Sequence, residues 1–300
     1  MTDLNDWRLQ YGSESFDFGR LSTTFPFAVQ VAVGDTEIAT QDQPHPTSDG
    51  VVMGRDSLSG FELTFSLTTI PTYPLVEKPW VSALDTFSSF KSAWRADAIR
   101  RNPGSYATLL NLDRNRLVYG RPRKTAQVMT AARKGIITYT ATFDTNGPDF
   151  YSGTEKINTI TPVPGSTSGL VGPLVSPLVT VGSSEDVADP TNDGDLPTWP
   201  IIEFHGPAAS QSLALLTGPN VIWTINVPDK LAFDEVLTVD TRPWHRSATL
   251  NGKPANGRIR GTQIEKCQLP VGTHRFRYRP VDRSGTAFAV MRWRDAYASL

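Results

Sequence analysis

The residues best suited to chemistry lie in one short stretch, residues 237–252, which reads LTVDTRPWHRSATLNG. This stretch holds an acid, an imidazole and a hydroxyl group in Asp240, His245 and Ser247, the group types of a hydrolytic triad. A triad normally takes its members from separate elements that converge in space. These three residues fall within a single strand–turn–strand, so the pattern favours a structural hairpin over a nucleophilic site.

The other reactive side chains do not form a recognisable site either. The single cysteine, Cys267, excludes an intrachain disulfide and is expected to be a buried thiol. Phosphate-loop, nucleophile-elbow and dinucleotide-binding motifs are absent from the sequence. No metal-ligand spacing links the four histidines, which are His45, His205, His245 and His274. We therefore predict no metal, no cofactor and no enzymatic activity.

Composition sets limits on the kind of protein this is. The formal net charge of the 300 residues is −1, so no global field favours nucleic acid or membranes. The N-terminus lacks the pattern of a secretory signal, and no apolar run approaches the ~20 residues that span a bilayer. We expect the chain to be made in a reducing cytoplasm.

Charge is nevertheless distributed unevenly. Residues 151–240 carry 2 Lys and Arg against 11 Asp and Glu, whereas residues 241–300 carry 12 against 3. These blocks could pair within one molecule or between copies, or could simply be solvated surface. The sequence leaves these alternatives open.

Period-two alternation dominates the chain and predicts half-buried strands. It is clearest in FAVQVAV (27–33), GFELTFSL (60–67) and GIITYTATF (135–143). One segment differs: residues 80–101 place Leu84, Phe87, Phe90, Trp94 and Ala98 at three- and four-residue steps. That spacing predicts an amphipathic helix whose apolar stripe packs on the core. The expected fold class is all-β with one helix.

Composition changes again between the two halves. Residues 161–197 are rich in Pro, Gly, Ser and Asp, which indicates a linker or docked arm. Short strands separated by turns follow at spacings typical of an antiparallel β-sandwich. The predicted domains are therefore 1–160, a linker at 161–197, and a sandwich at 198–300.

Two features of the sandwich suggest binding. Arg275, Arg277 and Arg279 alternate in HRFRYRP and so share one face of a strand, where like charges repel unless acids or a partner face them. The aromatic residues that could stack on a sugar ring are Trp244, Trp293, Tyr278 and Tyr297. A carbohydrate-binding protein that recognises host-envelope glycans is therefore the alternative function, although such aromatics more often pack in a core.

Several of these pieces, in this order and spacing, resemble the distal tail proteins (minor tail proteins) of long-tailed, siphovirus-type bacteriophages, particularly those that infect actinobacteria. In the first half they are PTSDGVVMGRDSLSGFELTFSL, the helix, LVYGRPRKTAQV and FDTNGPDFY. In the second half they are LPTWPIIEFHGPA, LTVDTRPWHRSATLNG, LPVGTHRFRYRP and AVMRWRDAY. The resemblance covers both halves.

The resemblance implies an N-terminal tail-tube-like β-barrel or belt domain and a C-terminal sandwich similar to galectins and carbohydrate-binding modules. It also implies a structural virion protein that forms a hexameric ring at the distal end of the tail, with a channel through which DNA passes without specific binding. The expected partners are further copies of the chain, the major tail tube protein, the hub or tail-associated protein, the tape measure, and receptor-binding or fibre proteins. No cofactor and no membrane insertion are implied.

Residues can be assigned to these roles. We predict that the belt domain makes the ring through edge-strand pairing and the loop around residues 50–60, with Gly54, Arg55 and Asp56 at the interface. The stretch at 237–252 is expected to form a sandwich hairpin. Its polar tie-points and turn residues are Asp240, Arg242, Arg246, Asn251 and Gly252, because Asn-Gly tolerates the positive φ of a tight turn.

Overall fold

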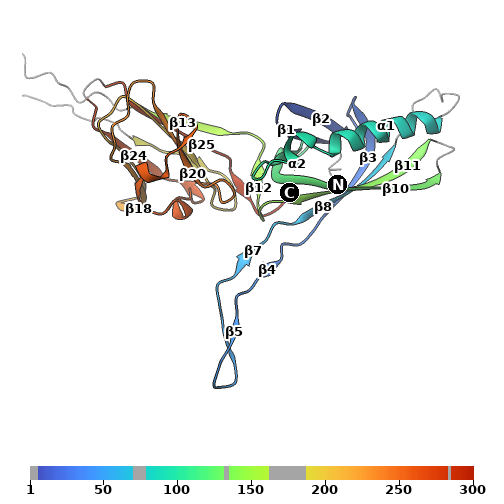
Figure 1. Ribbon diagram of the computed structural model, residues 1–300, viewed down its shortest axis with the longest axis horizontal. Helices are drawn as coiled ribbons and strands as arrows, with labels where there is room; N and C mark the ends of the chain where they lie inside the picture. The colour runs from blue at the N-terminus through green and yellow to red at the C-terminus, as the bar shows by residue number, and fades with distance from the viewer. Residues whose placement is uncertain (1–5, 70–78, 132–134, 162–186, 283–284) are drawn as a thin grey trace, which may run out of the picture. The chain divides into compact units, whose positions relative to one another are not determined.

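The computed structural model describes residues 6–69, 79–131, 135–161, 187–282 and 285–300. The chain forms two compact units, one of Met1–Gly153 with Tyr297–Leu300 and one of Thr154–Ala296. Both are built from strands, and the first also carries one long helix (Figure 1). The predicted fold class is therefore confirmed. No helix within the described ranges is long and apolar enough to cross a membrane.

The first unit is a β-barrel. Its strands run in the order β11-β8-β3-β2-β1-β9-β10, and β10 closes the ring by pairing with β11. All neighbours are antiparallel except β2 and β3, which pair in parallel at two positions only. The barrel strands are β1 Asp6–Tyr11, β2 Glu14–Gly19, β3 Phe25–Val33, β8 Glu62–Thr69, β9 Ala107–Asn111, β10 Arg116–Ala131 and β11 Ile136–Thr145, with β12 Phe150–Ser152 added beside β10.

The predicted alternation fills the barrel. Leu63, Phe65 and Leu67 of β8 have no exposed surface, and Tyr139 and Phe143 of β11 are equally buried. On β3 the pattern stops short of its end, because Val33 is exposed where the strand leaves the barrel. Burying each large apolar side chain contributes about 1.5–3 kcal/mol, so these strands contribute substantially to the stability of this unit.

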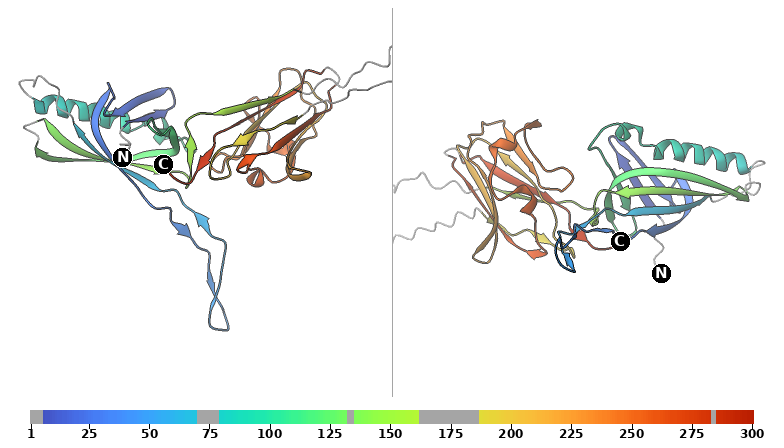
Figure 2. Two further views of the ribbon diagram at one scale, coloured as in Figure 1. Left: turned by 180° about the vertical axis from the view of Figure 1, so that it is seen from behind. Right: turned by 60° about the horizontal axis from the view of Figure 1, so that its bottom comes forward.

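Helix α1, Pro79–Trp94, lies along the barrel (Figure 2). Phe87 stacks on Tyr139 with ring centroids 3.9 Å apart, and Phe90 meets the edges or faces of several β2 and β3 aromatics. Burial raises the pKa of Tyr139 to about 12, and its hydroxyl donates to the Ala83 carbonyl over 3.0 Å.

The helix is shorter than the apolar spacing predicted. Ala96 adopts a left-handed conformation (φ 46°) and separates α1 from a single turn, α2 Asp97–Arg100. The expected stripe residue Ala98 is exposed, and Ile99 is buried in its place. The left-handed residue changes the direction of the following turn, so the three- and four-residue spacing no longer identifies the buried side chains.

A long hairpin joins β3 to β8 and projects from the barrel (Figure 1). We call residues 34–60 the arm. Short strands pair along it: β4 Ile38–Ala39 with β7 Ser57–Leu58, and β5 Gln43–Pro44 with β6 Val51–Val52. Every residue from 37 to 58 is exposed, so the arm has no core of its own.

The second unit is a β-sandwich. One sheet has the order β13-β25-β16-β19-β20-β21 and the other β14-β24-β17-β18-β22. Side chains from both sheets form one core, in which Trp223 and Phe276 lie with centroids 5.3 Å apart and Phe204 lies 6.4 Å from Tyr278. The Trp223 indole N–H donates to the Gln268 carbonyl over 2.6 Å, which satisfies its polar atom inside the core.

The strands of the two sandwich sheets have the following bounds, given in chain order. The first sheet contains β13 Lys156–Ile160, β16 Ile201–His205, β19 Val236–Asp240, β20 Ser247–Leu250, β21 Lys253–Pro254 and β25 Phe288–Trp293. The second contains β14 Val187–Ala188, β17 Gln211–Thr217, β18 Asn220–Val227, β22 Arg260–Gly261 and β24 Arg275–Pro280. The remaining sandwich elements are β15 Thr191–Asn192, β23 Gly272–Thr273 and the 3-10 turns Asn256–Arg258 and Ile264–Lys266. Strand β26 Ala296–Tyr297 belongs to the barrel sheet, where it follows β12.

The boundary between the units differs from the sequence expectation. Strand β13, which we placed in the first domain, pairs along its whole length with β25 of the sandwich. From the expected linker at 161–197, residues 162–186 lie outside the described residues, whereas β14 and β15 pair with β24 and β23. Pairing with strands far along the chain overrides the local Pro/Gly-rich composition. The last four residues, Tyr297–Leu300, belong to the first unit.

Candidate interaction surfaces

The hairpin at 237–252 is anchored by one buried carboxylate. Asp240, 5% exposed, accepts hydrogen bonds from the Arg242 backbone N–H over 3.0 Å and from its Nε and Nη2 over 2.9 and 2.6 Å. The Nδ1 atom of His245 lies 3.1 Å from the same carboxylate. Ser247 takes part as the backbone partner of Asp240 in the β19–β20 ladder. This geometry secures a strand exit, because one buried carboxylate holds the Arg242 backbone, the Arg242 guanidinium and the His245 ring together.

The rest of the hairpin follows the sequence in part. Asn251 and Gly252 have φ of 47° and 78°, and the Asn251 Oδ1 accepts from the Val236 N–H over 2.9 Å. Arg246 does not join the Asp240 cluster, since its Nη1 lies 3.5 Å from Glu265. The structure thus brings Asp240 and Arg242 together and places Arg246 elsewhere.

The three arginines of β24 share the outer face of their sheet, but their surroundings differ. Arg275 makes a two-pronged ion pair with Asp189 over 2.8 and 2.9 Å, and this bond lowers the pKa of the Asp189 carboxyl. Arg277 and Arg279 lie opposite the small residues Ala214 and Ser212 of β17. One member of the row therefore pairs with the acidic middle region of its own chain.

Two of the four aromatic residues considered as sugar platforms are core residues. Tyr278 has no exposed surface and donates to the Gln211 Oε1 over 2.5 Å, and Trp293 is 5% exposed. Tyr297 lies in the first unit, where the Arg116 guanidinium stacks 3.3 Å from its ring centroid. These three rings are thus engaged by the protein itself.

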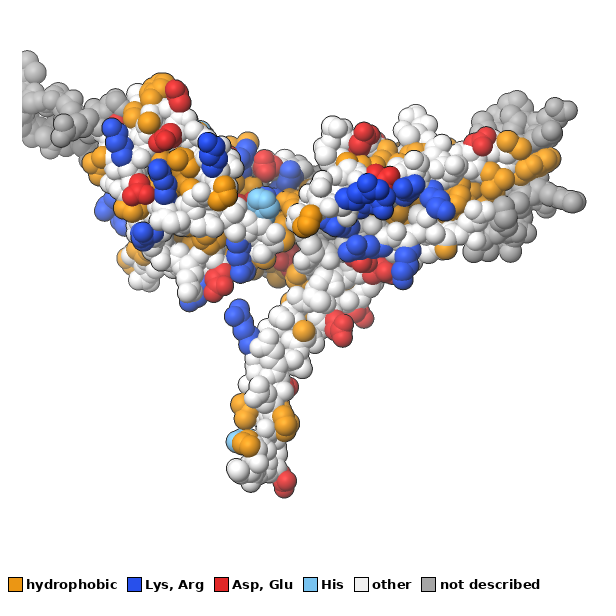
Figure 3. Space-filling view, viewed as in Figure 1, with side chains coloured by type: hydrophobic (Ala, Val, Ile, Leu, Met, Phe, Trp, Pro, Cys, Tyr) orange, Lys and Arg blue, Asp and Glu red, His pale blue; other side chains and the backbone are white. Residues whose placement is uncertain are grey.

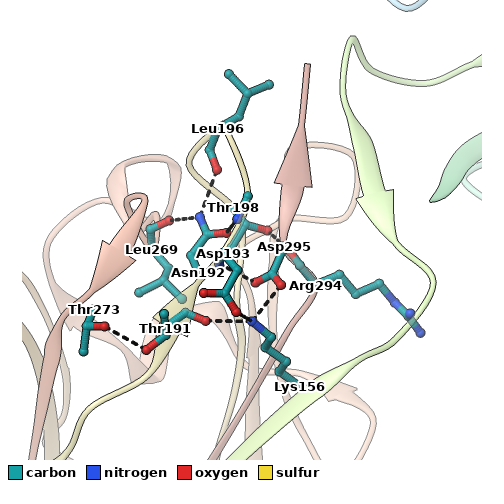
Figure 4. A network of polar contacts seen from close by, with 11 residues as sticks. Lys156, Thr191, Asn192, Asp193, Leu196, Thr198, Leu269, Thr273, Arg294 and Asp295 are labelled. Atoms are coloured by element: carbon teal, nitrogen blue, oxygen red, sulfur yellow. Dashed lines mark hydrogen bonds and ion pairs between the residues drawn. The ribbon is translucent and has the colours of Figure 1, made fainter. Parts of the chain in front are cut away.

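A polar network that the sequence did not reveal fixes the ends of the sandwich (Figure 4). The Lys156 ammonium on β13 lies 2.7 Å from Asp193 and 2.7 Å from Asp295, and it donates to the Thr191 carbonyl over 3.1 Å. Burial alone would lower the pKa of Lys156, but the hydrogen bonds to Asp193 and Asp295 outweigh it and raise the pKa. We call these residues the lysine clamp. Its members are more than a hundred residues apart at the extremes, so no local pattern could have indicated it.

The arm exposes both apolar and polar side chains to solvent. Its exposed apolar side chains are Ile38, Val51, Val52, Met53 and Leu58, and Met53 is 79% exposed. Gly54 has an internal role, because a Cβ atom there would lie 2.1 Å from the Gln41 carbonyl oxygen across the arm. Its N–H binds the Asp42 carboxylate over 2.8 Å. Arg55 and Asp56 are exposed.

The remaining reactive groups do not assemble into a site. Cys267 is fully buried, and burial raises the pKa of its thiol to about 12, which suits an inert core residue. Within the described ranges, no group of His, Cys, Asp and Glu could hold a metal ion. The candidate interaction surfaces are therefore the arm and the charged faces.

Comparison with solved structures identifies the fold. Over 97% of this chain and 98% of that chain, the protein is similar to the Dit protein of phage SPP1, with a TM-score of 0.54 and 16% sequence identity. That crystal structure is described as a paradigm of the hub adsorption apparatus in phages that infect Gram-positive bacteria. Two structures of the activated phage P2 baseplate, with Ca and with Sr, match at a TM-score of 0.49 and 12% and 11% identity, each over 96% of this chain and 97% of that chain. No family model and no curated protein matches. The chain has the fold of a phage distal tail protein, as the resemblance in its sequence implied.

Proposed function

We propose that this chain is a structural virion protein of the distal phage tail. In this proposal it forms a homo-hexameric ring that links the tail tube to the hub and to adhesin or fibre proteins, and leaves a channel for DNA. The observation that carries the proposal is the fold match to SPP1 Dit across both units. The actinobacterial host stays a prediction from sequence.

The exposed surface of the arm supports the proposal that copies of the chain assemble with one another. An isolated two-stranded hairpin is at best marginally stable in water, and this one also exposes five large apolar side chains. A surface of that kind marks an interaction site. We propose that the arm, with Gly54, Arg55 and Asp56, lies in the interface between copies.

The structure alters how strands would contribute to such an interface. We expected edge-strand pairing by the belt domain, but β11 pairs with both β8 and β10 and so closes the barrel there. The short strands of the arm keep their outer edges open, since each pairs with one partner only. The arm is therefore the part of the first unit best placed to reach a neighbour.

The proposal is tested by measuring the mass of the purified chain in solution as a function of concentration and imaging it by negative stain. We expect closed rings of six copies. A chain that stays monomeric at the highest attainable concentration contradicts the ring. Retention of a monomer on a glycan column would favour the carbohydrate-binding alternative, which the burial of Tyr278 and Trp293 disfavours.

A further inference from the structure

The arm is strongly acidic as well as apolar. Residues 34–60 contain five carboxylates and a single cation, Arg55. The carboxylates are Asp35, Glu37, Asp42, Asp49 and Asp56, and all five residues are exposed. A partner that covers the arm must therefore supply positive charge together with some apolar contact.

The barrel carries a surface of the opposite sign. Figure 3 shows Lys and Arg side chains gathered on one face of the first unit. We define the basic strip as six cations from three segments. They are Arg95 just before α2 and Arg100 at its end, Arg101 in the turn that follows, and Arg121, Arg123 and Lys124 in the middle of β10. Its neighbouring carboxylates are fewer, and they are Asp97, Asp144 and Glu62.

Contacts within the barrel hold this strip in one piece. Arg121 donates to the carbonyls of Ser105 and Asn102, each over 2.6 Å, which joins β10 to the turn after α2. Arg123 pairs with Asp144 over 2.8 Å, and Asp97 pairs with both Arg95 and Arg100. The strip is thus a preorganised cationic surface whose charge its own acids only partly balance.

We infer that the acidic arm of one copy binds the basic strip of the next copy, an inference that rests on the proposed ring. The arm projects away from its own barrel (Figures 1 and 2), so contact with a second copy needs no refolding. Because the arm and the strip are different surfaces, their contact is head-to-tail, the type that gives a closed ring when its rotation closes. Complementary potentials fix the register of such a contact and exclude wrong partners.

Two matched charge-reversal variants test this inference. The first is Asp35→Lys, Glu37→Lys, Asp49→Lys and Asp56→Lys on the arm, which changes the formal charge of the arm from −4 to +4. The second is Arg101→Glu with Lys124→Glu on the strip. Within the described residues none of these six side chains makes a hydrogen bond or ion pair, so the fold should survive, which circular dichroism and thermal melting check. Asp42 and Arg121 are left unchanged because they hold backbone groups in place.

Sedimentation velocity should show each variant alone to self-associate at least about tenfold more weakly than the unaltered chain at physiological salt, where the Debye length is about 8 Å. An equimolar mixture of the two should assemble again, because each reversed arm then meets a reversed strip and an even-numbered ring can alternate them. Asp234→Lys on the sandwich is the neutral control.

The outcomes separate the inference from the ring itself. If the unaltered chain forms rings and both variants form them equally well, the inference is overturned and the ring stands. If the variants fail alone and their mixture also fails, the arm and the strip meet other partners, and the inference is again overturned. A basic strip could instead bind nucleic acid. If the unaltered chain binds nucleic acid, and the strip variant loses that binding but still assembles, the inference is overturned and the ring stands. A chain that never associates overturns both proposals.

Discussion

The barrel and its arm are made from the same kinds of residues but are stabilised in different ways. In the barrel, β3 and β8 bury Phe27, Val29 and Phe65 beneath α1. In the arm, which continues the same two strands, Val51, Val52 and Met53 lie in water. The difference lies in what faces each strand, because a strand buries its apolar face only when another layer covers it. The arm lacks that layer within its own copy, and this is why a neighbouring molecule is expected to supply it.

Removing a ring from the barrel core should give the largest effect. Phe90→Ala deletes an aromatic side chain with no exposed surface that packs on Phe16, Phe18 and Phe25. We expect a loss of about 3–5 kcal/mol in the free energy of unfolding, measured by urea denaturation. The arm control, Met53→Ser, should change it by less than about 0.5 kcal/mol in the monomer. Equal losses in both would mean that the arm is part of the folded core.

The lysine clamp extends the contrast to the sandwich. Lys156→Met leaves Asp295, 4% exposed, without its ammonium partner, and an unsatisfied buried polar group costs about 1–3 kcal/mol. The exposed Arg8–Asp17 pair provides the control, since Arg8→Met should cost no more than about 1 kcal/mol. Denaturation curves of the two variants give the comparison. A clamp variant as stable as the Arg8 variant would show that Asp295 finds other partners.

Two close-contact glycines separate stability from assembly. A Cβ atom on Gly120 would lie 2.0 Å from the Asp144 carbonyl oxygen in the barrel, and one on Gly54 would lie 2.1 Å from the Gln41 carbonyl oxygen in the arm. Gly120→Ala should cost about 1–3 kcal/mol of barrel stability, as overpacking does. Gly54→Ala should leave the melting temperature of the monomer nearly unchanged and weaken ring formation. A reversed pattern, with the arm variant melting early, would remove the distinction.

Alkaline pH should affect the barrel through Tyr139. Its pKa is raised from about 10 when unfolded to about 12 when folded, so the folded state disfavours the phenolate. The stability that this group contributes is full below about pH 10 and is lost as the pH rises toward 12. Tyr139→Phe should flatten that part of the stability curve. An unchanged alkaline slope in the variant would assign the loss to other groups.

Sequence alone determined the local elements, because each depends on near neighbours. Alternation in GFELTFSL placed Leu63, Phe65 and Leu67 in the core, and Asn251-Gly252 formed the positive-φ turn that these residues tolerate. The apolar spacing also predicted the core-facing side of α1 up to Trp94. It failed beyond that residue because the left-handed Ala96 redirects the chain, which spacing cannot indicate.

Tertiary structure decided what the elements do together. It assigned β13 to the sandwich, joined Lys156 to Asp193 and Asp295, and left residues 37–58 without cover. Each of these outcomes depends on which distant segment arrives at a given strand edge or face. The free energy of such a contact depends on both partners together. The local sequence around one partner does not indicate which distant segment will supply the other.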